Sequence, residues 1–221
     1  MTLNIAAQGS DFVVLGSDSR GVFGDYRTAT ATIDTMIKSS KAAEHVGIQI
    51  SGAAEIGDAM LDEFLTIQAE KKVDGITPVM NEFRAFIQNK CNDYFKNIPF
   101  EKQPTMVFTI AGFDKKASVF DSPRVYSLMS QFGFAPNLHR YGYACMGIPQ
   151  YAIYIFNRRY SPQIDIEGLK GLVVYAIAET ATQEQRVGGQ IRLSVITPKG
   201  FTELSKADVD KILKARYEKT E

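Results

Sequence analysis

Cysteine and histidine are scarce in this chain, which has two cysteines, Cys91 and Cys145, and two histidines, His45 and His139. So few cysteines argue against a disulfide scaffold and agree with a reducing cytoplasm, where we expect the protein to reside. Neither histidine stands in a Cys/His spacing typical of a zinc site. The sequence therefore predicts no metal site and no cofactor.

Excess charge and long apolar runs are also absent. Lys plus Arg and Asp plus Glu both number 25, so overall charge gives no reason to expect binding to nucleic acid or to an anionic membrane. No run of about 18 apolar residues is present, and the first residues lack the pattern of a signal peptide. Neither the phosphate-binding loop nor the dinucleotide fingerprint occurs. These absences exclude membrane proteins and give nucleotide enzymes no support.

What remains is the composition of an ordinary globular domain. The 221 residues are 45% hydrophobic and 23% charged, which suits a substantial core. No internal repeat or low-complexity linker divides the chain. We expect a single domain over residues 1–221.

The chain begins with two short apolar runs, at residues 3–7 and 12–15, around a turn at residues 8–11. Such a pattern is typical of a β-hairpin. An antiparallel hairpin returns to its starting point, so we expect Asp18 to lie near Thr2 without any long-range assumption.

The remaining elements alternate between strands and helices. Residues 21–35 form a polar, threonine-rich block, and residues 132–139 match no element. The expected strands lie at 46–50, 105–111, 117–120, 125–128, 141–147 and 191–196. The expected helices lie at 53–71, 79–95, 151–155, 166–180 and 205–219. This order favours an α+β fold, with two sheets between helix layers in a four-layer αββα sandwich.

Thr2 is the strongest candidate for a catalytic group. If Met1 is removed, the α-amine of Thr2 can activate its own hydroxyl, so that one residue supplies both base and nucleophile. Retained Met1 turns that amine into an amide, which is not a base. The alternative is that Met-Thr is simply a common way for a chain to begin.

Several short motifs share an order and spacing. The first is an Ala-Asp-x-Arg-like block at residues 17–20, followed by two lysines, Lys38 and Lys41, and a His-x-Gly at residues 45–47. An Ile-x-Gly at residues 50–52, a Gly-Asp at residues 57–58 and a late Gly-Gly at residues 188–189 come after them. Together with Thr2 they resemble the proteasome β-subunit family of N-terminal nucleophile hydrolases over nearly the whole chain.

The resemblance implies a role for each matching residue. Thr2 is the expected nucleophile, Lys38 the cation beside its hydroxyl, Asp18 the partner of Lys38, and the Gly52 N–H the oxyanion donor. Arg20 and Glu184 are expected to support the site. Taken singly, these residues have ordinary alternatives: an Asp18–Arg20 ion pair, a solvated lysine and a glycine at a bend.

The sequence also departs from the family. The auxiliary Ser-Gly-Ser-Pro block corresponds here to residues 146–149, Met-Gly-Ile-Pro, the auxiliary aspartate to Glu184, and a nearby serine to Val187. Two functions stay open: a threonine-type peptidase or amide hydrolase in a homo-oligomeric ring, and a non-catalytic structural or interaction subunit. The absence of a long segment before the first strand favours a β-type layout, and peptides or proteins are the expected substrates. The sequence identifies no ATPase or scaffold partner.

Overall fold

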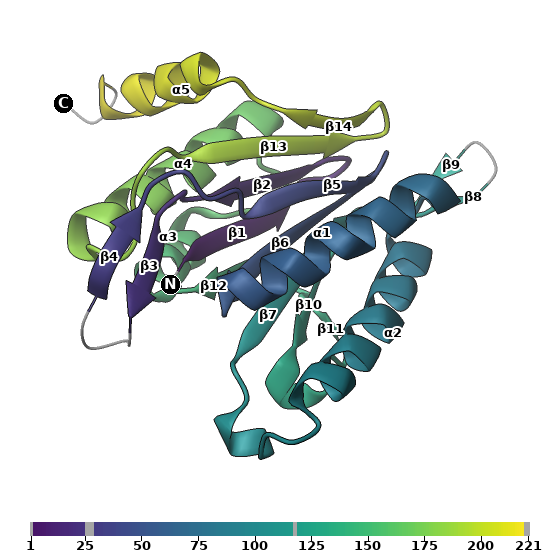
Figure 1. The fold of residues 1–221 in the computed structure, drawn as a ribbon. Helices are drawn as coiled ribbons and strands as arrows, with labels where there is room; N and C mark the ends of the chain where they lie inside the picture. Colours follow the sequence, from purple (N-terminus) through teal and green to yellow (C-terminus); the bar gives the residue numbers. More distant parts are fainter. Residues whose placement is uncertain (1, 25–28, 117–118, 219–221) are drawn as a thin grey trace.

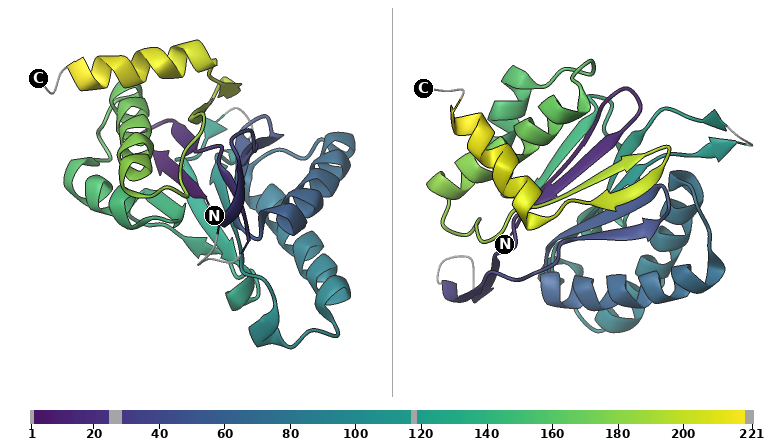
Figure 2. Two further views of the ribbon diagram at one scale, coloured as in Figure 1. Left: turned by 60° about the vertical axis from the view of Figure 1, so that its left-hand side comes forward. Right: turned by 90° about the horizontal axis from the view of Figure 1, so that it is seen from above.

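The computed structural model describes residues 2–24, 29–116 and 119–218. Two five-stranded sheets lie face to face, and helices cover the outer face of each (Figure 1). The further views in Figure 2 show the two helix groups on opposite sides of the paired sheets. The four-layer αββα arrangement expected from the order of elements is confirmed.

The first sheet contains both β1 and β14, the first and the last of the numbered strands. Its strands follow the order β12-β1-β2-β13-β14, and all neighbours are antiparallel. Their bounds are β1 Leu3–Gln8, β2 Val13–Ser17, β12 Tyr143–Gly147, β13 Arg192–Thr197 and β14 Gly200–Glu203. The expected hairpin at the start of the chain is confirmed as β1 and β2, which lie side by side within this sheet.

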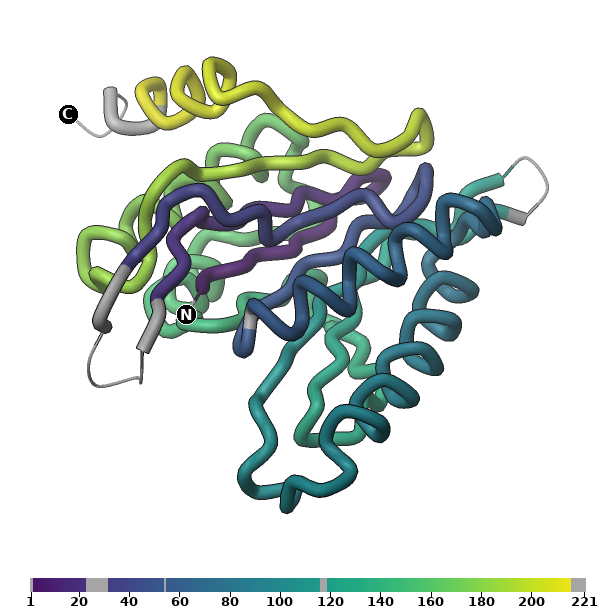
Figure 3. The backbone as a smooth tube through the Cα atoms, in the orientation of Figure 1, coloured from purple at the N-terminus to yellow at the C-terminus, as the bar shows by residue number. Residues whose placement is uncertain are grey.

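The second sheet has the order β11-β10-β7-β6-β5 and is also antiparallel. Its strands are β5 Ser39–Ala43, β6 Val46–Gly52, β7 Met106–Gly112, β10 Arg124–Met129 and β11 Asn137–Leu138. Two small hairpins stand outside the main sheets: β3 Gly21–Gly24 with β4 Ala29–Ile33, and β8 Lys115–Lys116 with β9 Val119–Phe120. Figure 3 traces the backbone in the same orientation, with the first strands of the chain in purple beside the late strand β13 in yellow-green.

Helices α1 and α2 cover the second sheet, while α3 and α4 cover the first and α5 packs against α4. Their bounds are α1 Ala54–Lys71, α2 Ile76–Phe95, α3 Gln150–Arg159, α4 Ile166–Gln183 and α5 Lys206–Glu218, with short 3-10 turns η1 Phe100–Lys102 and η2 Ser130–Phe132. Asp165 caps α4 by accepting a hydrogen bond from the Gly168 N–H at 2.6 Å, which satisfies one of the free donors of the first turn.

Some expectations need correction. The threonine-rich block, to which no element was assigned, contains β3 and β4, with residues 25–28 outside the described part. The unplaced segment 132–139 contains the end of η2 and the two residues of β11. The expected strand at 117–120 is described only from Val119, and residue 219 of the expected last helix also lies outside the described residues. These short elements lack the periodicity of longer ones, and tertiary pairing rather than local pattern defines them.

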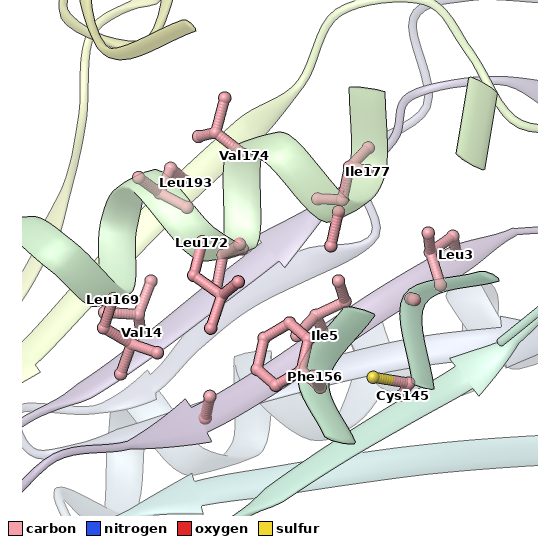
Figure 4. Close-up of a cluster of buried hydrophobic side chains, with 14 of the residues drawn as sticks. Leu3, Ile5, Val14, Cys145, Phe156, Leu169, Leu172, Val174, Ile177 and Leu193 are labelled. Carbon is pink, nitrogen blue, oxygen red and sulfur yellow. The ribbon is translucent and has the colours of Figure 1, made fainter. Parts of the chain in front are cut away.

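Both helix–sheet interfaces are apolar. Leucine, isoleucine and valine side chains from β1, β2, β13 and α4 interdigitate in one of them, as Figure 4 shows for Leu3, Ile5 and Leu172 among others. The other is rich in aromatic rings, with Phe83 at 4.9 Å from Phe64 and 4.8 Å from Phe108 between ring centroids. Burial of these faces holds each helix pair on its sheet.

The interface between the two sheets is different, because its composition changes along the strands. At one end, small and apolar residues from both sheets form a third cluster that includes Ala6, Leu15, Ala111 and Val125. Two residues further along each of these strands, the next side chain that faces the other sheet is buried and polar. These residues are Asn4, Ser17, Gln49, Thr109 and Ser127. Side chains alternate between faces along a strand, so each strand passes from an apolar to a polar position over two residues.

Candidate active site

The hairpin places Thr2 beside Asp18. In the pairing of β1 with β2, Asn4 lies opposite Ser17, and the Asp18 N–H donates to the Leu3 carbonyl at 3.2 Å. The Leu3 N–H in turn donates to Asp18 Oδ1 at 2.9 Å. Thr2 itself is buried, with 2% of its surface exposed, and its carbonyl accepts from the Ile148 N–H at 2.8 Å. The polar end of the intersheet space therefore begins at Thr2.

The carboxylate of Asp18 is held from four directions. Besides the Leu3 N–H, Oδ1 accepts from Lys38 Nζ at 2.7 Å. Oδ2 accepts from the Arg20 N–H at 3.2 Å and from the Gly188 N–H at 3.1 Å. A buried carboxylate with this many donors stays in place without needing solvent. Asp18 thus joins the hairpin, the strand after it and the loop before β13.

Lys38 is a fully buried cation, with 1% of its side chain exposed against 0% for Asp18. Its ammonium donates to Asp18 Oδ1 at 2.7 Å and to the Arg20 carbonyl at 2.6 Å. Burial lowers the pKa of Lys38, although Asp18 and, more weakly, Asp58 oppose that shift. Within the described part of the chain, Lys38 makes no hydrogen bond to the Thr2 hydroxyl. The predicted contact with Asp18 is present, and Lys38 has a second ligand that the sequence did not reveal.

Arg20 fixes the loop around this pair. Its guanidinium binds Asp34 through Nε at 2.8 Å and Nη2 at 2.9 Å, and Nη1 donates to the Gln185 carbonyl at 2.8 Å. A Cβ added at Gly188 would lie 2.7 Å from the Arg20 guanidinium, so a side chain at this position would displace the guanidinium. The backbone carbonyl of Arg20 meets Lys38 while its side chain ties two loops together.

Gly52 and Glu184, the two other predicted site residues, make no hydrogen bond to Thr2, Asp18 or Lys38 in the described part of the chain. Gly52 ends β6 with a φ of 100°, and a Cβ there would lie 2.2 Å from the Thr105 carbonyl oxygen. Glu184 follows the last residue of α4 and is paired with Arg186, whose Nη2 lies 2.6 Å from Glu184 Oε2. Arg186 lowers the pKa of Glu184 through that hydrogen bond. The Glu184 carboxylate is therefore engaged by Arg186, and no described hydrogen bond connects it to Thr2.

Apolar residues stand at the positions where the family pattern has hydroxyls. Ile148 and Val187 are both buried in the helix–sheet core of the first sheet. Gly147 has a φ of 91°, and a Cβ there would lie 1.8 Å from the Thr2 carbonyl oxygen, so strand β12 approaches β1 more closely than any side chain permits. The residue types predicted this loss of hydroxyls, and the structure shows what the replacements do instead.

Sequence reasoning missed the polar side chains between the sheets. Asn4 and Gln49 each cross from one sheet to the other: Asn4 Nδ2 donates to the Ile50 carbonyl at 2.6 Å, and Gln49 Nε2 donates to the Gly16 carbonyl at 2.9 Å. The available signal was their position on apolar strands, where a polar residue on an inward-facing position stands out.

Across the described ranges, no group of three or more His, Cys, Asp or Glu side chains is placed to hold a metal ion. No helix in these ranges is long and apolar enough to cross a membrane. The arrangement at Thr2 can instead offer a hydroxyl, a buried ammonium and a fixed carboxylate.

The structure is an α+β sandwich with two antiparallel sheets between helix layers. A buried Lys38–Asp18 pair lies at the start of its first strand and marks the candidate site. The chain belongs to the proteasome subunit family: the family model described as "Proteasome subunit" matches residues 2–196. The match extends to Ile196 in β13, leaves out β14, and confirms the family resemblance. No curated protein matches the sequence.

Proposed function

We propose that the protein is a threonine-type N-terminal nucleophile hydrolase that cleaves amide bonds in peptides or proteins, with Thr2 as the nucleophile. The observation that carries this proposal is the buried ion pair between Lys38 and Asp18, at 2.7 Å, beside the first residue of β1. A buried ion pair contributes little net stability compared with apolar packing of the same volume. A catalytic requirement explains why the pair is there.

The chemistry requires that the peptide bond before Thr2 be cleaved. The freed α-amine titrates at about 7.7–8.0 in an ordinary environment, so at pH 7 roughly a tenth to a sixth of it is unprotonated and able to accept a proton. The amine then takes the hydroxyl proton as the Thr2 Oγ attacks the substrate carbonyl, and it returns that proton to the leaving amine. Water hydrolyses the resulting ester and regenerates Thr2.

Lys38 and Gly52 serve the charges that develop during this reaction. The Lys38 ammonium, oriented by Asp18 and by the Arg20 carbonyl, favours the developing alkoxide of Thr2. The Gly52 N–H is the proposed donor to the substrate oxyanion, where one such donor is worth about 2.7–4 kcal/mol of transition-state stabilisation. Arg20 acts through its loop contacts rather than on the substrate.

The alternative is a non-catalytic subunit of an assembly. Three features favour it: Ile148 and Val187 give Thr2 no hydroxyl partner, and Glu184 is paired with Arg186. Both functions agree with the family, whose membership implies assembly into multisubunit rings. We propose a homo-oligomeric ring in the cytoplasm, and light scattering that finds only the 24.5 kDa monomer at micromolar concentration contradicts it.

The test begins with intact-mass measurement and N-terminal sequencing, which establish whether Thr2 is the first residue. Protein that begins at Thr2 is then assayed with a broad set of fluorogenic peptides and with a covalent probe directed at an N-terminal threonine. We expect labelling and cleavage by the natural protein and loss of both in Thr2→Ala. Thr2→Ser keeps a hydroxyl and an amine, so it is the matched control that should retain measurable turnover.

No labelling and no cleavage, with Thr2 verified as the first residue, favours the non-catalytic subunit. Cleavage that survives Thr2→Ala contradicts Thr2 as the nucleophile.

A further inference from the structure

Four polar side chains meet between the sheets behind Thr2, and each has an oxygen without a protein partner among the described residues. They are Asn4 Oδ1, Ser17 Oγ, Gln49 Oε1 and Ser51 Oγ. All four residues are at most 1% exposed. A buried polar atom left unsatisfied costs about 1–3 kcal/mol, so four together need a compensating ligand.

The four oxygens belong to one small region. Asn4 lies opposite Ser17 in the β1–β2 pair, and the Asn4 amide reaches the Ile50 carbonyl, next to Ser51, at 2.6 Å. The Gln49 amide crosses back to the Gly16 carbonyl, next to Ser17, at 2.9 Å. One crossing hydrogen bond joins β1 to β6 and the other joins β6 to β2, so both lie at the same stretch of β6.

These hydrogen bonds also settle the orientation of both amides. A backbone carbonyl can only accept, so the nitrogens of Asn4 and Gln49 must face Ile50 and Gly16. The remaining amide oxygens can only accept hydrogen bonds. Ser17 and Ser51 can each donate one hydrogen bond, but within the described chain neither donates to these oxygens. The site has two amide oxygens that can only accept and two serine hydroxyls, and no protein donor reaches the amide oxygens within the described chain.

We propose that this region, formed by Asn4, Ser17, Gln49 and Ser51, is a binding site for ordered water between the two sheets. Water supplies two donors and two acceptors, and buried waters usually make about three hydrogen bonds to such groups. A monovalent cation is the alternative ligand, because neutral oxygens also coordinate cations. The Lys38 ammonium beside this layer is neutralised by Asp18 at 2.7 Å, so the experiment must distinguish water from a cation.

The water site continues the face that carries Thr2. Thr2 and Asn4 are two residues apart on one chain, so they point to the same side of the first sheet. Met146, which lies opposite Asn4 on β12, offers no hydroxyl there. Water held by Asn4 and Ser17 thus provides hydrogen-bonding atoms on a side of Thr2 where the protein has few. The site is a property of the fold and does not depend on whether Thr2 is catalytic.

Serine-to-alanine variants distinguish a hydrated site from a dry one, because the two cases predict changes of opposite sign in the folding equilibrium constant. With water bound, Ser17→Ala and Ser51→Ala each remove a water ligand, and the folding equilibrium constant should fall about fivefold. In a dry site the same changes delete an unsatisfied hydroxyl, and the constant should rise. Ser40→Ala, at a partly buried position of β5, is the control and should change it by less than about twofold. Urea unfolding measures all three.

A crystal structure of the natural protein supplies the second measurement and does not depend on the variants folding. We expect water within hydrogen-bond distance of both Asn4 Oδ1 and Gln49 Oε1, and its loss or displacement in Ser17→Ala. Stabilisation by both alanine variants, or a site without density between the amides, overturns the proposal. So does an anomalous signal at the site after soaking with thallium ions, which identifies a cation instead.

Discussion

The two ends of the space between the sheets are built from the same strands but from different residues. At one end Leu15 of β2 packs across the interface, where a Cβ added at Gly47 would lie 2.4 Å from its Cδ1. Two residues along the same face of β2, Ser17 is buried with an unpartnered hydroxyl. The helix–sheet interfaces instead consist mainly of two large hydrophobic clusters.

The difference separates stability from chemistry. Close apolar packing between Leu15 and the second sheet holds the sandwich together at a distance from Thr2. The polar end can then hold a buried ammonium and unsatisfied oxygens, which no tightly packed core tolerates without cost. One strand serves both purposes because a single step of its alternation separates them.

The largest effect is expected at the polar end, from removing one partner of the ion pair. Lys38→Met keeps most of the side-chain volume but leaves the Asp18 carboxylate buried without its cation, and we expect a loss of about 4 kcal/mol in the free energy of unfolding. Lys41→Met is the control, since Lys41 pairs with Glu44 at the surface with 46% of its side chain exposed, and should cost under about 1 kcal/mol. Equal losses in the two variants contradict a special role for burial. Chemical denaturation is the measurement.

At the apolar end, Leu15→Ala should lower the free energy of unfolding by about 3 kcal/mol, because it leaves a cavity that the closely packed neighbours can fill only in part. Leu138→Ala, on edge strand β11 with 38% of the residue exposed, is the matched change and should cost less than half as much. If Leu15→Ala instead proves nearly neutral, the two ends do not differ in packing. The same variant of protein that begins at Thr2 should retain its peptide cleavage under folding conditions.

The smallest effect concerns Asp58 on α1, whose pKa is raised to about 6, first by burial and then by Asp62. A carboxyl whose pKa is higher in the folded than in the unfolded chain destabilises the fold once it ionises. Its cost is therefore absent below about pH 4, grows as pH rises to about 6, and is complete above that. Asp58→Asn should thus stabilise the protein at pH 7 by about 1 kcal/mol, a value discounted for partial solvation.

Stability measured at pH 4 and pH 7 tests this sign. The gain from Asp58→Asn should vanish at the lower pH, whereas Glu55→Gln, at an exposed position of the same helix, should show little change at either. A gain that persists at pH 4 means that packing, not ionisation, is responsible.

The long, periodic elements and the hairpin at Thr2 could be predicted from the sequence because they depend on local alternation and turn residues. So could the approach of Lys38 to Asp18, through family spacing. The Arg20 carbonyl as a ligand of Lys38 could not, since backbone acceptors leave no mark in a residue pattern. Nor could the pairing of Glu184 with Arg186, two residues away, or the Asn4 and Gln49 crossings, which depend on which strands from distant parts of the chain meet face to face.

The four hydrogen bonds of Asp18 also have a consequence for biosynthesis. One donor, Gly188, stands 170 residues further along the chain, so the carboxylate cannot acquire its full set of partners while the ribosome is still making the second half of the protein. If the hairpin forms early, Asp18 still lacks the Gly188 N–H, which emerges from the ribosome near the end of translation. The charge arrangement beside Thr2 is consequently completed only in a chain that has folded almost to its last strands, and a truncated nascent chain lacks it.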